Sequence, residues 1–395
     1  MQPSSKQKLG EYLKRLREGY GYTLRKVEEK TEKSGTQIDN SQLSRFEKGQ
    51  TIPSFEKLKI LADIFNISIQ NFSDIIDLSS LDIYKPKSSN FRQLVQDGEA
   101  EYRLGNFGKA FAIFERAVEI AEARRGSNGN EMLVESKMKM ATALKALGRL
   151  NMCENELRTI LRNNRDIPVK LRARVLMQLA YVNRELGDFY VAQMMAQECL
   201  KLLKGEEDRE MEAAVLNTLG NIAYDEERFT EAVESYEKAL SILEKLQGKD
   251  ELKVRVMVNL GGSYVSSGSF ARGFTLINNA LNIARDRGFR RTAALALTRM
   301  GEAYMSKKQY NRARHCFRES DMLSDRQDGK YSDILFLNSY RVWELFKLED
   351  NSVQEKIYFR RLKQLRSQVE RRFPEICKFD NLIKMMGRKD EKNNN

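Results

Sequence analysis

The sequence predicts an all-α protein in which a bundle of five short helices precedes a long array of repeated helical hairpins. Apolar residues recur at helical spacing, and one motif returns about every 40 residues along most of the chain. Only 5 prolines and 23 glycines occur among 395 residues. Because both residues interrupt helices, this composition favours long helices over sheets.

Composition excludes several classes of protein. The chain is 41% hydrophobic and 31% charged, which is typical of a folded domain rather than a disordered one. Its 4 cysteines do not make a disulfide scaffold. The N-terminus lacks the apolar core of a signal peptide, and no apolar run approaches the ~18 residues of a membrane span. We therefore expect a cytoplasmic protein without a membrane partner.

The charge is strongly basic, with a formal net charge of +12. Residues 1–60 hold 13 Lys and Arg against 8 Asp and Glu, and the stretch 356–392 is also basic. Such a balance is compatible with nucleic acid or acidic partners.

Helical spacing places the five N-terminal helices at about 8–18, 24–30, 41–47, 54–65 and 68–76. The first carries one apolar stripe, and Thr23 is placed to cap the second. Asn40 or Ser41 opens the third, which buries Leu43 and Phe46. Core candidates of the fourth helix are Phe55, Leu58, Ile60, Leu61, Ala62 and Ile64.

The outward side of the third helix is polar without being acidic. A short helix presented by a compact bundle fits the DNA major groove, where side chains that donate and accept hydrogen bonds read base edges. We expect the base-contacting residues to be Asn40, Ser41, Gln42, Ser44 and Arg45.

Residues 22–72 resemble the cro/phage-repressor type of helix-turn-helix domain, most specifically in SQLSRFEKGQTIPSFEKLKILA. The segment 32–39 is longer than the tight turn of the simplest members. By position, the resemblance implies that four further residues contact phosphates, namely Thr23, Arg25, Lys48 and Thr51. The alternative is a helix-turn-helix domain used only for protein contacts.

The remaining chain repeats one unit. Residues 77–90 read as a linker between the helix-turn-helix domain (1–76) and the array (91–372). The hairpin turns fall at Gly105, Gly148, Gly187, Glu227, Gly268 and Lys308. Seven residues before each turn lies a small residue, in order Gly98, Ala141, Ala180, Gly220, Gly261 and Gly301. Small residues at these places let the two helices of a hairpin approach closely.

The array resembles the tetratricopeptide repeat, with 220–240 the most faithful copy, which implies a right-handed α-solenoid. A degenerate seventh hairpin is expected over 333–371, and a basic, disordered tail over 373–395.

In such an array the first helices of the hairpins line a binding groove. We expect its residues to be Met177, Tyr181, Arg184, Asn217, Asn221, Tyr224, Thr298, Glu302 and Met305, with Asn259 and Arg299 at its margin. An asparagine amide both donates to and accepts from a peptide backbone, so it can hold an extended peptide of any sequence. The alternative is that these asparagines are only solvated.

Motifs of catalysis are missing from the sequence. It has no GxxxxGK[ST] loop, no GxGxxG after a strand and a single histidine. We expect no enzymatic activity, no cofactor and no metal site.

Fusion of these two modules resembles the peptide-pheromone-responsive transcriptional regulators of bacteria. The resemblance implies a homodimer that binds a double-stranded DNA operator and senses a short peptide, as in quorum sensing. Two alternatives remain open: a DNA-bound adaptor whose groove recruits a protein partner, and a repeat scaffold that does not bind DNA.

Overall fold

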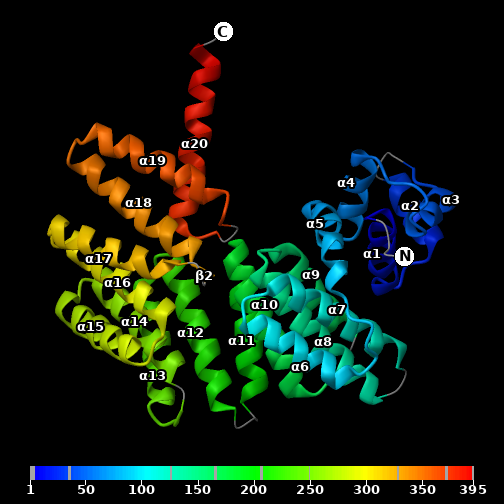
Figure 1. Ribbon diagram of the computed structural model, residues 1–395, viewed down its shortest axis with the longest axis horizontal. Coiled ribbons are helices and arrows are strands. Elements are labelled where there is room, and N and C mark those ends of the chain that lie inside the picture. The colour runs from blue at the N-terminus through cyan, green and yellow to red at the C-terminus, as the bar shows by residue number, and fades with distance from the viewer. Residues whose placement is uncertain are drawn as a thin grey trace. The chain divides into compact units, whose positions relative to one another are not determined.

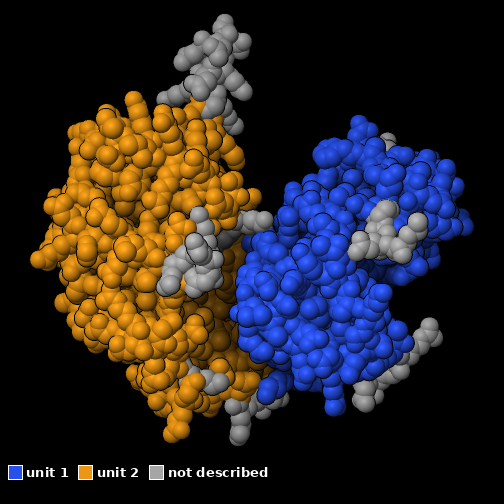
Figure 2. All heavy atoms as spheres, in the orientation of Figure 1, with its two compact units in different colours: residues 1–175 blue, residues 176–395 orange. Residues whose placement is uncertain are grey.

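The computed structural model describes residues 5–33, 37–124, 127–163, 167–204, 208–248, 250–326, 329–369 and 372–393. Its elements are helices, apart from an antiparallel pair of two-residue strands, β1 (Asp325–Arg326) and β2 (Gly329–Lys330). The all-α class is therefore confirmed. The chain divides into two compact units, residues 1–175 and 176–395 (Figure 2). Within the described ranges, no helix is both long and apolar enough to cross a membrane.

The N-terminal bundle consists of α1 (Ser5–Gly19), α2 (Leu24–Lys33), α3 (Asn40–Glu47), α4 (Phe55–Ile64) and α5 (Gln70–Leu78). The apolar stripe of α1 is buried, as are Leu43 and Phe46 of α3. Phe55 was expected in the core, but its side chain is 72% exposed. It is the first residue of α4. Of the long segment between α2 and α3, residues 34–36 lie outside the described ranges.

Side-chain caps and an ion pair with α1 position α3. Thr23 Oγ1 accepts a hydrogen bond from the Lys26 amide (3.1 Å) at the start of α2, as expected. The cap of α3 is Asp39, whose carboxylate accepts from the Gln42 amide (2.7 Å), and not Asn40 or Ser41. At the other end of α3, Glu47 is bound by Arg17 of α1 through two hydrogen bonds of 2.6 and 2.9 Å. The helix is thus capped at its start and bound to α1 at its end.

The segment expected as a linker, 77–90, is partly helical and packed. It contains the 3-10 helix η1 (Ser79–Tyr84), whose Asp82 is buried in an ion pair with Lys8 of α1. Lys8 also pairs with Glu115 of the first repeat (3.1 Å), and Lys85 pairs with the same carboxylate (2.9 Å). Burial tends to raise the pKa of Glu115, but these two ammonium groups outweigh burial and hold it below its ordinary value.

Further contacts join the bundle to the first repeats inside this unit. The Tyr12 hydroxyl accepts hydrogen bonds from Asn71 and from Asn155 of α9, each 3.3 Å long. Arg149 donates to Asp74 of α5 (2.9 Å), which is buried. Buried charges and amides that satisfy one another fix one relative orientation, because separating them would leave them unpaired. The helix-turn-helix domain is therefore docked on the first repeats rather than tethered to them.

Seven helical hairpins follow (Figure 1). They are α6 (Phe91–Arg103) with α7 (Phe107–Ala123), α8 (Ser127–Ala146) with α9 (Leu150–Asn163), α10 (Val169–Leu186) with α11 (Phe189–Leu203), α12 (Arg209–Asp225) with α13 (Phe229–Leu243), α14 (Asp250–Ser266) with α15 (Phe270–Asp286), α16 (Arg290–Ser306) with α17 (Tyr310–Ser324), and α18 (Ser332–Leu348) with α19 (Ser352–Arg366). All six expected turn residues have positive φ, and Asp350 (φ 52°) repeats the pattern in the seventh hairpin. The residue with positive φ ends the first helix of each pair and reverses the chain direction into the second helix.

In four hairpins the small residue is a glycine that packs against the side chain found sixteen positions later. A Cβ atom at Gly98, Gly220 or Gly301 would lie less than 3.0 Å from the ring of Phe114, Tyr236 or Phe317 respectively. At Gly261 the partner is Ile277. Each large side chain is buried against the backbone of the preceding helix, so the two helices of the pair pack at short distance.

The end of the chain differs from the expected disordered tail. Helix α20 (Pro374–Asn393) follows the seventh hairpin, and Phe373, Ile376 and Phe379 at its start are buried. They pack with Phe336, Trp343 and Leu362 in one apolar cluster. The apolar residues Phe373, Ile376 and Phe379 recur about every three positions, which is the spacing of a helix. The many charged residues around them favoured the prediction of a disordered tail instead.

Replacing Gly301 by Ala tests the packing of the hairpins. We expect the free energy of unfolding to fall by about 1–3 kcal/mol, because the new methyl group overlaps the Phe317 ring. Urea unfolding followed by circular dichroism measures the change. Gly19→Ala is the matched control, since its Cβ would meet its nearest neighbour at 3.6 Å. Equal unfolding midpoints for the two variants would contradict this account.

Candidate functional site

Helix α3 presents its polar side to solvent. Asn40, Ser41 and Arg45 are exposed, and Gln42 and Ser44 are half-buried. Leu43 and Phe46 hold the opposite side in the core. The five residues expected to contact bases therefore share one accessible face of one helix.

Local hydrogen bonds orient two of these side chains. Lys57 of α4 donates to Gln42 Oε1 (2.7 Å), and the Arg45 guanidinium donates to the Ser41 hydroxyl (3.3 Å). Lys57 was not among the expected contacts. Its signal was available in the sequence, since it lies in the first turn of α4 directly after the Ser54 cap.

The residues expected to contact phosphates lie at the start of α2 and just after the end of α3. Thr23 and Arg25 are exposed at the start of α2, and Lys48 and Thr51 are exposed just after α3. The Arg25 side chain is 84% exposed, and its contact with Glu29 is long (3.9 Å). These cations and hydroxyls are free to meet an external anion.

In the second unit, three asparagines of the expected groove meet. Asn259 of α14 donates through Nδ2 to the side-chain oxygens of Asn217 and Asn221 of α12, both at 3.1 Å. The Tyr236 hydroxyl donates to the same oxygen of Asn221 (2.8 Å). Among the described residues, the Nδ2 groups of Asn217 and Asn221 donate to no partner. Asn221 is half-buried, whereas Asn217 is buried, so the Asn221 amide is the donor that a ligand can reach.

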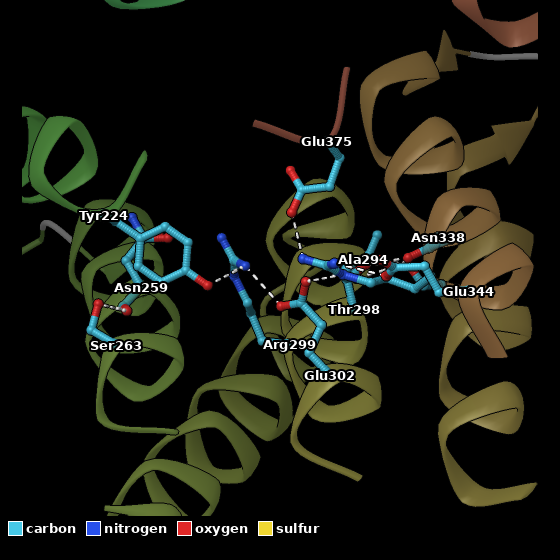
Figure 3. Close-up of polar contacts among 12 residues, drawn as sticks. Tyr224, Asn259, Ser263, Ala294, Thr298, Arg299, Glu302, Asn338, Glu344 and Glu375 are labelled. Atoms are coloured by element: carbon cyan, nitrogen blue, oxygen red, sulfur yellow. Dashed lines mark hydrogen bonds and ion pairs between the residues drawn. The ribbon is translucent and has the colours of Figure 1, made fainter. Parts of the chain in front are cut away.

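A charged network continues from these asparagines along the first helices (Figure 3). Arg299 of α16 donates to the Tyr224 hydroxyl (2.8 Å) and to Glu302 (2.8 Å), and its guanidinium lies 4.4 Å from the centre of the Tyr224 ring. Arg341 of α18 donates to the other oxygen of Glu302 (2.9 Å). Burial tends to raise the pKa of Glu302, but the two guanidinium groups outweigh burial and hold it below its ordinary value.

Arg184 of α10 forms a separate buried ion pair with Asp225 of α12 (2.7 Å). Tyr181, one turn earlier on the same helix, is half-buried. We call the surface made by Asn217, Asn221, Tyr224, Asn259, Arg299 and Glu302 the ligand face.

One expected groove residue lies elsewhere. Thr298 is completely buried and hydrogen-bonded to Asn338 Oδ1 (2.8 Å) and the Ser320 hydroxyl (3.0 Å), between α16, α17 and α18. It is one residue before Arg299, which turns it toward the neighbouring helices. The expectation of a ligand contact at Thr298 is therefore wrong.

Sequence reasoning also missed Asp225, Tyr236 and Arg341, which complete the networks. Arg341 stands one repeat after Arg299, so extending the period into the seventh hairpin would have found it. Asp225 and Tyr236 could be recognised only after packing had placed them beside Arg184 and Asn221.

Two shallow cavities, of about 470 and 690 Å³, lie away from the ligand face. Their lining comes largely from the second helices α13, α15 and α17. No cluster of three or more metal-binding side chains occurs in the part of the chain that the structure describes.

Comparison with known proteins identifies both modules. A model described as Helix-turn-helix matches residues 13–72, and models described as Tetratricopeptide repeat match 171–245, 211–286 and 294–325. The chain thus combines a helix-turn-helix domain with tetratricopeptide repeats, as its sequence predicted. No curated protein sequence matches the chain.

Solved structures share the fold at low sequence identity. A Rap protein complexed with the Competence and Sporulation Factor is 14% identical, with a TM-score of 0.58 over 72% of this chain and 78% of that one. The Rap conjugation gene regulator of the plasmid pLS20, in complex with a Phr peptide, is 12% identical, with a TM-score of 0.56 over 94% and 97%. At these identities the likeness shows the fold alone.

Replacing Glu302 by Gln tests the charged network. We expect the free energy of unfolding at pH 7 to fall by about 2 kcal/mol, because Arg299 and Arg341 lose their shared counter-charge in a mostly buried place. The pKa of Glu302 is lower in the folded chain than its ordinary value of 4.5. Its stabilising effect is therefore complete above about pH 4.5 and disappears as the pH falls through the folded value.

Urea unfolding at pH 7 and at successively lower pH measures this effect. The difference in the free energy of unfolding between the wild type and Glu302→Gln should become smaller as the pH falls. Glu234→Gln, at an exposed position of α13, is the control and should match the wild type throughout. A gap that stays constant with pH would show that the Glu302 charge contributes nothing.

Proposed function

We propose that this chain, a helix-turn-helix domain joined to tetratricopeptide repeats, is a sequence-specific transcriptional regulator that binds a short signalling peptide. The observation that carries the proposal is the union of two polar surfaces in one chain. One is the exposed face of α3, and the other is the ligand face with its unpaired amide donors.

DNA binding is supported by the chemistry and placement of the α3 face. Arginine is suited to guanine and glutamine to adenine in the major groove. Exposed Thr23, Arg25, Lys48 and Thr51 flank this face at the ends of α2 and α3, where backbone phosphates would lie. Phosphate contacts would set the register, and the α3 side chains would read the sequence.

Peptide binding is supported by the composition of the ligand face. The half-buried amide of Asn221 can donate to a carbonyl group of an extended peptide, and the charged network beside it can select the side chains of that peptide. Of the structures that share the fold, one was solved with a Phr peptide and another with the Competence and Sporulation Factor. A short peptide is therefore the favoured ligand class, with a folded protein partner as the alternative outcome.

We further propose that the regulator works as a homodimer on two half-sites about one helical turn apart. The helix-turn-helix domain is docked on the first repeats through Lys8, Tyr12 and Arg149. A rearrangement of those repeats would therefore move the DNA-reading helix with them. A bound peptide would shift the population of DNA-competent dimers rather than take part in a reaction.

Arg45→Ala tests sequence reading. We expect binding to the operator to weaken by about 1–3 kcal/mol, and the preference over unrelated DNA to shrink, because a base contact is lost. Lys48→Ala should instead weaken binding to all sequences and reduce the salt dependence by about one unit of slope. Fluorescence anisotropy with fragments upstream of the protein's own gene measures both, using an unrelated fragment for comparison.

Arg103→Ala is the control for this experiment, because it removes the same charge from an exposed position of α6. It should bind like the wild type. Suppose that the wild-type protein binds every upstream fragment no more tightly than the control variant binds unrelated DNA. That result would contradict the regulator proposal and favour the repeat scaffold.

Asn221→Ala tests the ligand face. Peptides encoded by small reading frames beside the gene should raise the melting temperature of the wild-type protein and change its DNA binding. Loss of the Asn221 amide should weaken peptide binding about tenfold, corresponding to roughly one hydrogen bond. Asn279→Ala, at an exposed position of α15, should have no effect. Stabilisation by a folded protein but by no peptide would favour the adaptor.

A further inference from the structure

The chain crosses back over its own repeats before it ends. We call residues 372–378, at the start of α20, the strap. The Arg372 amide donates to the Glu185 carbonyl at the end of α10 (2.7 Å). Lys378 pairs with Glu227 in the turn after α12 (3.3 Å). The strap thus contacts the third and fourth hairpins, although it follows the seventh in sequence.

Between those two contacts, the strap places a carboxylate on the charged network. Glu375 pairs with the Arg341 guanidinium. Arg341 also donates to Glu302 of α16 (2.9 Å) and to Glu344 of its own helix (3.0 Å). Of these three carboxylates, only that of Glu375 belongs to a segment outside the repeats.

This difference makes Glu375 the exchangeable partner of Arg341. Glu302 is held by Arg299 as well, and Glu344 lies one turn away on the same helix. A carboxylate from another molecule could replace that of Glu375 with the same charge and the same donors, so the exchange would leave no guanidinium donor unpaired. A neutral amide could not make this replacement without losing a charge-assisted hydrogen bond.

The position is also close to the amides proposed to hold a peptide. Arg341 shares Glu302 with Arg299, and Arg299 contacts Tyr224, which lies one turn after Asn221 on α12. The Arg341 side chain is 22% exposed even with Glu375 in place. A peptide on the ligand face would therefore extend toward Arg341.

We propose that Arg341 is a carboxylate-binding subsite of the ligand face, and that Glu375 of the strap occupies this subsite in the unliganded chain. The ligand class is a short peptide that brings a carboxylate, either its free C-terminus or an acidic side chain. This inference rests on the proposed function, since it names the chemistry of the peptide. Binding displaces the Glu375 carboxylate and releases the strap from the network.

The test measures retention of peptide pools on the full-length protein by affinity selection and mass spectrometry. Three pools of random hexapeptides are used. The first lacks Asp and Glu and has free C-termini, the second is the same pool with amidated C-termini, and the third is amidated but contains Glu. Each pool is applied to the wild type, to Glu375→Gln and to Glu344→Gln. The last variant is the matched control, because it removes the same charge from the same arginine outside the strap.

We expect Glu375→Gln to retain about three- to tenfold more of a carboxylate-bearing pool than the wild type does. A gain for the first pool identifies the C-terminus as the source of the carboxylate, and a gain for the third identifies an acidic side chain. Retention of the second pool should not change. Adding Arg341→Gln to Glu375→Gln should abolish the gain, and melting curves establish that the variants are folded.

An equal gain for all three pools would overturn the proposal, because the strap would then only obstruct access. The same gain in Glu344→Gln, or retention of no pool by any variant, would also overturn it. Failure of the proposed function is seen separately, as absence of operator binding or of any response to the peptides encoded beside the gene. A peptide-responsive regulator with no preference for carboxylates would contradict this inference alone.

Discussion

The close approach of the two helices in each hairpin is the constraint on which the rest of the structure depends. In four of the hairpins it requires a glycine, such as Gly220 or Gly301, beneath a large side chain sixteen positions later. Because the same fit recurs in successive hairpins, equivalent positions on the first helices come to lie side by side. Asn217 of α12 thereby meets Asn259 of α14, and Glu302 of α16 meets Arg341 of α18. The ligand face is a product of this regular packing.

Polar residues along that face are placed at a cost in desolvation, which their mutual hydrogen bonds offset. Glu302 stays ionised because two guanidinium groups surround it, and the guanidinium groups stay in place because Glu302 is ionised. Such a network is sensitive to any new charge nearby. A surface of this kind suits ligand recognition better than an apolar face would, since each partner has a definite geometry that a ligand must match.

The helix-turn-helix domain obeys a different constraint, because it is docked on the first repeats while the polar side of α3 stays exposed. The bundle uses α1, α5 and η1 for docking, through Lys8, Tyr12 and Asp74. Helix α3 takes no part in these contacts, and its polar side remains exposed. The docking contacts and the exposed polar face of α3 therefore lie on different sides of one small domain.

The amino-acid sequence by itself determined the helical class, the recognition helix and every hairpin turn through Lys308, because these follow from local periodicity, caps and left-handed turn residues. It also identified Asn217, Asn221, Asn259, Arg299 and Glu302 from their place in the repeat. Only tertiary structure decided that Thr298 is buried, that Asp82 of the expected linker pairs with Lys8, and that Glu375 reaches Arg341. These outcomes join residues from about 20 to more than 70 positions apart, or turn neighbours on one helix to opposite sides. Local pattern carries no information about such pairs, since they exist only once the hairpins have stacked.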